Sequence, residues 1–513
     1  MDRPARFLPL ILAACAVLFY WQVLSYGLWF DDYMDLRPWG KADAWRALTG
    51  AWSVQGWQDP YHRPLSSLLT FLLFELFGLN TRALHATSLA GLALIVIVLF
   101  EAVRRLVDRR WATVVVVAYL LHPVLPNSTI AWVGNLKHVA AVVTVVSALW
   151  WWAARGASVT WRAWWPIAAC AVVGFYVKED TVMVLPALLV TQWIVARSSG
   201  ARPAPTAALW AGSAGLLAVL ALVRMVVLPE AAGSTDLFFE RPLREALLNA
   251  AYTPARALFV IRYQGEIMWW ATAFVTLLVV AGGVAAARQP SSIAGRLWIL
   301  GACLGAAFSA PLLFAIDMTT MRAHLVTLAA SLVWSGGVAA LWQWVTLRHV
   351  RVLVGAVVVL GALRLGFIVQ RQLDERFGPC GWETGNFDRD VSAWPDHVIP
   401  ADTKAWLARK TAVCEDERTP YLWDEVDAIR WRTEDGIVAL VSTRLTRARL
   451  EISPGSGDAW LMGPQGVIAH LPDGTGGSIT IALPTSWRSW LRDSHRLMLR
   501  TTSPRDLTIT PIR

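Results

Sequence analysis

About eleven apolar segments recur along the chain, each close to the roughly 20 residues that a helix needs to cross a bilayer. Hydrophobic residues make up 56% of the 513 residues and charged residues only 16%, whereas soluble domains average about 25% charged. The sequence therefore predicts a polytopic α-helical membrane protein with about eleven transmembrane helices. The predicted spans lie near residues 7–29, 82–103, 111–125, 135–153, 163–177, 180–196, 207–228, 266–287, 297–316, 324–345 and 352–369.

Arginines concentrate in alternate connections between these segments. They are Arg3 and Arg6, Arg104 to Arg110, Arg155 and Arg162, Arg197 and Arg202, Arg288 and Arg296, and Arg348 and Arg351. Basic loops remain in the cytoplasm, so the N-terminus is predicted to be cytoplasmic. Eleven crossings then place the chain from about residue 370 on the outer face. The net charge of +9 follows mainly from this topology, and we predict no nucleic-acid partner.

Two segments have a second interpretation. The stretch 64–79 is apolar enough for a short span, but counting it would move the basic connections outside, so we interpret it as a helix in the outer interface. Leu12 to Cys15 is similar to a lipoprotein processing site. The uncharged run continues to Phe30, which is longer than a signal sequence needs, and an uncleaved anchor is therefore predicted.

The chain changes character after the last apolar segment. Charges become frequent, 401–410 favours a short helix, and short strands are predicted near 437–442, 459–462, 467–471 and 478–483, separated by Gly and Pro. We therefore predict a transmembrane domain over 1–369 and an extracytoplasmic β-rich α+β domain over 370–513. Cys380 and Cys414 of the outer domain form a candidate disulfide, because thiols pair in oxidising compartments.

Two adjacent carboxylates, Asp31 and Asp32, follow the first apolar segment directly. Carboxylates are costly near hydrocarbon and are usually retained there for a function. A carboxylate held at the membrane surface is suited to act as a general base on a lipid-linked substrate.

Further polar groups are predicted at the same surface. They are Tyr61 to Pro64 with His62 and Arg63, Asn135 with Lys137 and His138, Lys178 to Asp180 with Glu179, and Arg322 with His324. Each alone has a structural interpretation as a solvated helix end, a lipid-headgroup anchor or an ion pair that contributes little when exposed. Together they fit one task, because cations stabilise the charge that develops on a departing phosphate and Arg binds phosphate through forked contacts.

The order of these motifs resembles the GT-C glycosyltransferases, which are membrane enzymes that use polyprenyl-phosphate sugars. The nearest branch contains the protein O-mannosyltransferases, the TMTC-like proteins and bacterial lipid A aminoarabinose transferases. The similar stretches are the acidic pair, Tyr61-His62-Arg63-Pro64-Leu65 with Phe77 to Asn80 and His85, His122-Pro123 with Trp132 to His138, and Lys178-Glu179 with Pro186. They cover roughly residues 7–190 in the family's order.

Several positions depart from the family pattern. His62 is inserted into the usual Tyr-Arg-Pro, and Asn135 with Lys137-His138 replaces the common Gly-Arg and acid. His324 follows Arg322 and Ala323 where relatives often carry an aromatic residue. These positions surround the expected donor site, so they affect the donor sugar and the phosphate contacts more than the reaction class.

The resemblance implies an inverting transfer of a sugar from a polyprenyl-phosphate donor to an acceptor hydroxyl at the outer face. It implies that Asp31 is the general base and that Asp32 orients the acceptor or a neighbouring basic group. The implied phosphate and donor contacts are His62, Arg63, Lys137, His138, Lys178 and Arg322, with Glu179 positioning Lys178. Some members bind a divalent metal near these acids; the sequence has no dedicated ligand set, and metal dependence stays open.

A transporter or flippase for a lipid-linked glycan is the alternative, since it also has many spans and buried charges. Such proteins have paired repeats with broken helices near the midplane, and no internal repeat is evident. An anchoring protein whose outer domain binds a partner is a further alternative, although it leaves the acidic pair unexplained. The acceptor, whether a glycan, a lipid or a protein hydroxyl, and the donor sugar are left open. A bacterial inner membrane with a periplasmic outer face is the predicted location, and an endoplasmic-reticulum membrane with a luminal outer face fits the same features.

Overall fold

The structure is a computed structural model of the whole chain. It describes residues 7–26, 45, 47–49, 63–77, 80–155, 160–199, 204–227, 255, 257–259, 262–263, 266–267, 269–311, 323–373, 430–432, 437–441, 447–455, 457–463, 466–482, 496–501 and 506–511. These residues belong to two compact units: the first takes in residues 1–24, 31–261 and 269–371, and the second takes in residues 25–30, 262–268 and 372–513.

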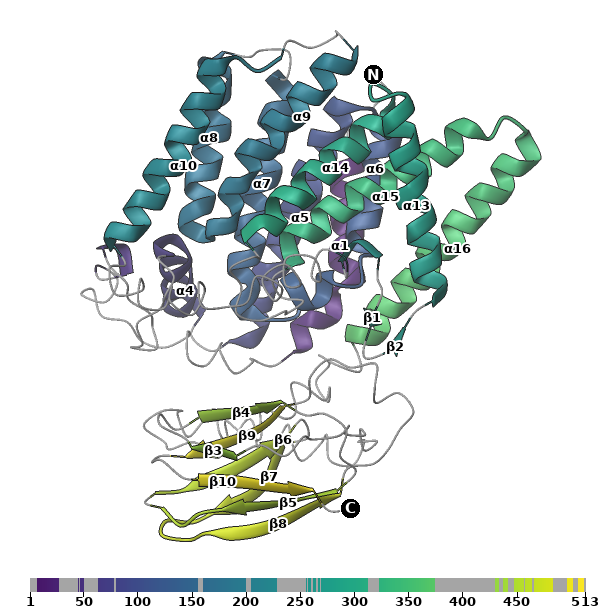
Figure 1. Cartoon of the computed structure of the whole chain (residues 1–513). Coiled ribbons are helices and arrows are strands. Elements are labelled where there is room, and N and C mark those ends of the chain that lie inside the picture. The colour runs from purple at the N-terminus through teal and green to yellow at the C-terminus, as the bar shows by residue number, and fades with distance from the viewer. Residues whose placement is uncertain are drawn as a thin grey trace. The chain divides into compact units, whose positions relative to one another are not determined.

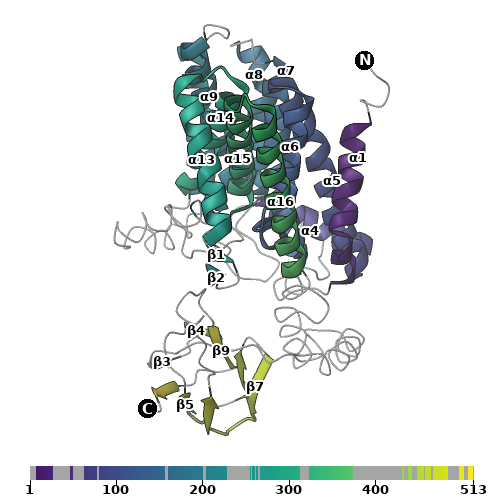
Figure 2. The ribbon, with the colours of Figure 1, turned by 90° about the vertical axis from the view of Figure 1, so that its right-hand side faces the viewer.

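The first unit is helical. Its α-helices are α1 (Leu8–Phe19), α4 (Pro64–Phe77), α5 (Thr81–Leu106), α6 (Arg109–Leu120), α7 (Leu136–Arg155), α8 (Trp161–Val177), α9 (Val184–Ser199), α10 (Ala207–Val227), α13 (Trp269–Arg288), α14 (Ile293–Ser309), α15 (His324–Trp344) and α16 (Arg348–Gln372). The helices α7, α8 and α10 lie side by side (Figure 1). Seen from the side, α13 and α15 also run alongside each other (Figure 2).

Seven of the described helical segments are long and apolar enough to cross a membrane. They are Arg82–Leu106, Val133–Arg155, Glu179–Ser198, Ala207–Val226, Trp270–Arg288, His324–Trp344 and Arg348–Arg371. The protein is therefore a multi-pass helical membrane protein, as predicted. The total of eleven crossings stays a prediction, because α1, α4 and α14 are apolar but shorter.

The first helix ends earlier than the apolar run that contains it. The helix α1 stops at Phe19, and the short 3₁₀ helix η2 (Trp21–Ser25) follows it. The last carbonyl groups of a helix lack partners inside the helix. The carbonyl of Phe19 accepts a hydrogen bond from Gln370 Nε2 of α16 at 2.6 Å. This long-range bond stabilises the end of α1 at Phe19, whereas the sequence predicted one continuous span over 7–29.

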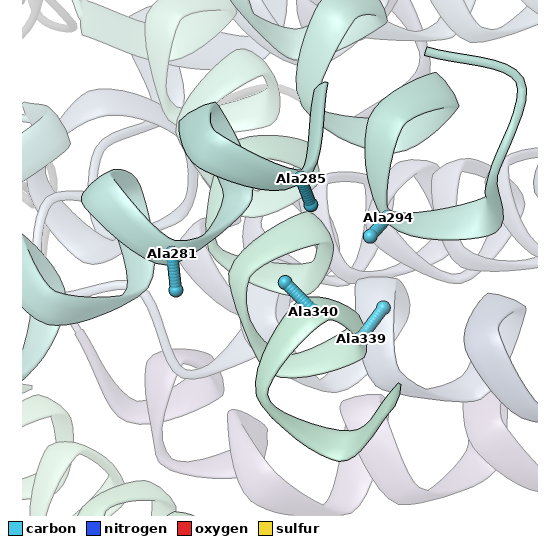
Figure 3. Close-up of a cluster of buried hydrophobic side chains, with 5 residues drawn as sticks. All are labelled: Ala281, Ala285, Ala294, Ala339 and Ala340. Atoms are coloured by element: carbon cyan, nitrogen blue, oxygen red, sulfur yellow. The ribbon is translucent and has the colours of Figure 1, made fainter. Parts of the chain in front are cut away.

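Close packing of α13, α14 and α15 depends on residues with small side chains. Figure 3 shows five buried alanines that gather between these helices: Ala281, Ala285, Ala294, Ala339 and Ala340. A Cβ on Gly337 of α15 would overlap the Leu278 carbonyl group of α13, and one on Gly301 of α14 would lie 2.7 Å from the Ala329 carbonyl oxygen. Small residues let membrane helices approach closely, so van der Waals contact can hold them together.

The helix α15 carries hydroxyl side chains in its buried interior. Thr327, Ser331 and Ser335 are fully buried, and each hydroxyl donates to the carbonyl four residues earlier at 2.7–2.8 Å. These bonds satisfy the hydroxyls locally. As a result α15 runs through the middle of the unit with its polar groups paired, and it presents His324 at its first residue.

The second unit contains two four-stranded antiparallel sheets among its described residues. The strands are β3 (Arg430–Arg432), β4 (Ile437–Val441), β5 (Arg447–Ile452), β6 (Ala459–Gly463), β7 (Gly466–Leu471), β8 (Gly477–Ala482), β9 (Arg496–Thr501) and β10 (Asp506–Pro511). Their orders are β3-β10-β5-β8 and β4-β9-β6-β7. A two-stranded pair, β1 (Arg262–Tyr263) with β2 (Glu266–Ile267), is grouped with this unit. Cys380, Cys414 and the helix predicted over 401–410 lie outside the described residues.

Candidate functional site

The candidate site lies where several helices of the first unit begin or end. Arg63 precedes α4, His138 is in the first turn of α7, Lys178 follows α8, and His324 begins α15. The 3₁₀ helix η5 (Glu179–Met183) joins Lys178 to α9. Hydrogen bonds, an ion pair and a ring stack connect these residues, although they are far apart in the sequence.

Lys178 is held in an extended conformation by its neighbours. Its φ and ψ are −161° and 123°, which end α8, and its N–H donates to the Gly174 carbonyl at 2.6 Å. The Thr181 hydroxyl donates to the Lys178 carbonyl at 2.7 Å. One residue earlier, the Val177 carbonyl accepts a hydrogen bond from the Ser66 hydroxyl of α4 at 2.6 Å. The backbone on both sides of Lys178 is therefore fixed.

Gly174 allows η5 to fold tightly against α8. A Cβ at this position would lie 2.5 Å from Thr181 Oγ1 and 2.8 Å from Thr144 Oγ1 of α7. Any larger residue would push the turn after Lys178 away from the two helices. The absence of a side chain at Gly174 thus sets the position of the Lys178 turn.

The side chain of Lys178 points to His138. The distance from Lys178 Nζ to His138 Nε2 is 3.2 Å, and both residues are buried, with exposed fractions of 8% and 4%. His138 Nδ1 lies 2.8 Å from the Ser128 carbonyl oxygen. Ser128 belongs to η3 (Pro126–Ile130), a single π-helical turn before the 3₁₀ turn η4 (Val133–Asn135). Such π turns are frequent at functional sites.

A second imidazole covers the ring of His138. The rings of His138 and His324 are stacked with centroids 4.3 Å apart and planes 9° from parallel. His324 is fully buried, and its Nε2 lies 3.6 Å from Asp180 Oδ2. The stack joins the beginnings of α7 and α15, and Asp180 links it back to η5.

An ion pair attaches α4 to the same turn. Arg63 Nε donates to Glu179 Oε2 at 2.9 Å, and the two side chains are only 17% and 14% exposed. An ion pair this buried holds its partners more firmly than an exposed pair does. Arg63 and Ser66 together fasten the start of α4 to residues 177–179.

Burial lowers the pKa of Lys178, which lies between two spans, to about 7. The negative charge of Asp180 opposes this shift, the positive charges of Arg63 and Lys137 add to it, and Glu179 opposes it again. Loss of hydration disfavours the ammonium form of a buried lysine. Near neutral pH, Lys178 can therefore gain or lose a proton, and an anion placed beside it would favour the charged form.

Another buried histidine, His122, has a different environment. His122 Nε2 lies 2.9 Å from the Ala257 carbonyl, and its Nδ1 accepts from the Val124 N–H at 3.2 Å. Its ring stacks on Trp334 at 4.6 Å, and the Trp334 indole donates to the Leu258 carbonyl at 2.8 Å. These contacts connect residues 257–258 to the helices.

The structure brings part of the predicted site together. Arg63 pairs with Glu179, Lys178 with His138, and the charges of Arg63, Lys137 and Glu179 act on Lys178. The remaining predicted site residues lie outside the described part of the chain: Asp31, Asp32, His62 and Arg322. Asn135 is buried in η4.

Three residues that contribute to the site were not predicted as site residues from the sequence. Asp180 and His324 appeared among the polar groups without a role, and the carbonyl of Ser128 has no sequence signal at all. The one indication in the sequence was that Lys137-His138 departs from the family pattern, because a histidine that replaces a common family residue needs hydrogen-bond partners of its own. Within the described residues, no group of three His, Cys, Asp or Glu side chains could hold a metal ion.

Comparisons with known proteins found similar structures. No protein family profile and no curated sequence matches the chain. The oligosaccharyltransferase AglB of Archaeoglobus fulgidus, in complex with an inhibitory peptide and a dolichol-phosphate, matches with a TM-score of 0.45 and 11% identity, covering 83% of this chain. This chain spans 62% of the archaeal protein. ArnT of Cupriavidus metallidurans bound to undecaprenyl phosphate matches with a TM-score of 0.39 and 17% identity, over 79% of this chain and 69% of ArnT.

With identities below 25% and TM-scores below 0.5, these similarities assign neither an activity nor a ligand to this chain. The function proposed below is derived from the chain's own residues.

Proposed function

We propose that this protein is an inverting GT-C-type glycosyltransferase that moves a sugar from a polyprenyl-phosphate donor to an acceptor hydroxyl at the outer face of a bacterial inner membrane. One observation carries the proposal. A buried lysine, Lys178, lies at the ends of several membrane helices, held by hydrogen bonds and surrounded by the charges of Arg63 and Lys137. A fixed ammonium group in a buried site is what a departing lipid phosphate requires.

The chemistry divides between two sets of residues. Asp31 removes the proton from the acceptor hydroxyl, and the oxygen attacks the anomeric carbon as the bond to the donor phosphate breaks. Asp32 orients the acceptor. The negative charge that appears on the phosphate oxygen is stabilised by Lys178, with Arg63, Lys137, His62 and Arg322 completing the donor contacts. Removing a general base lowers a rate by about 10²–10⁴.

Ion pairing explains why the site contains acids as well as cations. Glu179 accepts a hydrogen bond from Arg63 at 2.9 Å, and Asp180 lies close enough to act on the charge of Lys178. Without the donor, a cluster of cations alone would be destabilised by repulsion between its members. The carboxylates of Glu179 and Asp180 offset part of this positive charge, so the cations can stay in position to bind a phosphate.

The test is the accumulation of lipid-linked sugar in cells that carry Asp31→Asn. The expected result is a build-up of one polyprenyl-phosphate sugar, detected by mass spectrometry of extracted lipids. Asp35→Asn is the matched control, because it removes a nearby carboxylate that has no proposed role. An unchanged lipid pool in Asp31→Asn, with the variant inserted at wild-type level, would refute the transfer reaction and favour transport.

A further inference from the structure

We propose that His138 is a positioning residue for Lys178 and not a phosphate ligand. Its neutral ring holds the lysine ammonium in one orientation, so that the remaining N–H bonds of the ammonium meet the donor phosphate. This inference rests on the proposed function for the identity of the phosphate. It changes the role that the sequence predicted for His138.

The hydrogen bonds of His138 determine its tautomer. A backbone carbonyl can only accept, so the ring nitrogen that faces the Ser128 carbonyl at 2.8 Å, Nδ1, carries a hydrogen. Nε2 faces Lys178 Nζ at 3.2 Å. A neutral imidazole with its hydrogen on Nδ1 has a lone pair on Nε2. Nε2 therefore accepts a hydrogen bond from Lys178.

The position of the proton between the two side chains follows from their ordinary basicity. A free lysine has a pKa of about 10.4 and a free histidine one of about 6.5. With a single proton shared between the two groups, the ammonium keeps it and the imidazole remains neutral. A doubly protonated ring would instead place an N–H against the ammonium and repel it.

No ring nitrogen of His138 remains for a ligand. Nδ1 donates to Ser128, Nε2 accepts from Lys178, and the residue is only 4% exposed. By contrast, two of the three N–H bonds of Lys178 have no hydrogen-bond partner among the described residues. The donor phosphate therefore meets Lys178, and His138 acts through it.

Stacking prevents the His138 ring from turning. The ring of His324 lies parallel to it at 4.3 Å. His324 is fully buried at the beginning of α15, where its Nε2 lies 3.6 Å from Asp180 Oδ2. The plane of the His138 ring, and with it the direction of the Nε2 lone pair, is set by two helices and by η5.

Two substitutions separate this positioning role from a merely structural one. The side-chain amide of His138→Gln can reach Lys178 with an accepting oxygen, but it gives up the position of Nδ1 beside Ser128. His138→Asn places its amide nitrogen near the position of Nδ1 and keeps the bond to Ser128, but it is too short to reach Lys178. Positioning predicts that Gln replaces His better than Asn does, and a structural role predicts the reverse.

The readout is the binding of undecaprenyl phosphate to the full-length protein in detergent micelles, measured alongside sugar transfer. We expect His138→Asn to weaken this binding about tenfold, as for a lost hydrogen bond to a charged group, and His138→Gln to bind within about threefold of the wild type. Lys178→Gln should weaken binding about as much as His138→Asn. The double variant Lys178→Gln/His138→Asn should show no further loss, because His138 acts through Lys178.

Different failures have different meanings. If His138→Asn binds the lipid as the wild type does, or if its effect adds to that of Lys178→Gln, the positioning role is wrong. If His138→Gln binds worse than His138→Asn, the histidine serves the η3 turn instead. Binding that depends on Lys178 without any sugar transfer by the wild type would refute the proposed function and leave the Lys178–His138 assignment standing.

Discussion

Replacing Gly174 with alanine tests whether the tight turn after α8 positions the site. The new Cβ would lie 2.5 Å from Thr181 Oγ1, so this oxygen must retreat by about 0.9 Å to reach 3.4 Å, the near limit of ordinary contact. Thr144 Oγ1 and Thr181 Cβ, both 2.8 Å away, must also move. Overpacking of this kind costs about 1–3 kcal/mol. The gain of about 0.5–1 kcal/mol from replacing a helical glycine offsets part of it.

Gly215 provides the matched control. It also lies inside a membrane helix, α10, and a Cβ there meets no atom within 4 Å. Gly215→Ala therefore gains the same helix propensity without the clash, and the difference between the two variants isolates the overpacking cost of about 1–3 kcal/mol. SDS-driven unfolding in mixed micelles measures that difference.

The functional consequence of Gly174→Ala follows from what Thr181 holds. The Thr181 hydroxyl donates to the Lys178 carbonyl, so displacing it moves the ammonium, and the donor KM should rise while Gly215→Ala keeps the wild-type value. If the two variants unfold within about 0.5 kcal/mol of each other and share one donor KM, the close approach at Gly174 does not position the site.

Two further outcomes follow from the charges. The pKa of Lys178 is lowered to about 7, so the ammonium is present below that pH and lost above it, and the donor KM should rise from about pH 6 to about pH 9. Lys178→Arg should flatten this rise, because arginine stays charged. An unchanged pH dependence of the donor KM in Lys178→Arg would contradict the assignment. Glu179→Ala removes the carboxylate that pairs with Arg63 Nε, so the separate losses of Glu179→Ala and Arg63→Ala should sum to about 1–3 kcal/mol more than the loss in the double variant Arg63→Ala/Glu179→Ala. Additive losses in this cycle, measured by the same unfolding assay, would show that the pair contributes no coupling.

The helices of the membrane unit were predictable because lipid imposes one strong rule. Every backbone polar group must be paired inside the bilayer, so a long apolar run forms a helix whatever its neighbours are. Segments such as 207–228 and 324–345 coincide with α10 and α15 to within a residue. The end of α1 was not predictable, because the bond to the Phe19 carbonyl comes from Gln370, 351 residues away.

Site residues were predictable only where a local motif carried them. Lys178 and Glu179 stand in a recognisable pair, and Arg63 precedes a proline that begins α4. The partners that give these residues their geometry are distant: His138 is 40 residues from Lys178, and Arg63 is 116 residues from Glu179. No periodicity in the sequence indicates that His324 stacks on His138, since this contact depends on how α7 and α15 pack.

Rigidity is the property of this site that bears most directly on the proposed sugar transfer. Stabilising a departing phosphate requires charges that are already in place, because reorganising them during the reaction would raise the barrier. Lys178 is fixed through its own N–H and carbonyl, and through its ammonium by His138. The bond from Ser66 to Val177 adds α4 to these restraints. Since they come from different helices, loosening any one of them should weaken donor binding while the helices remain folded.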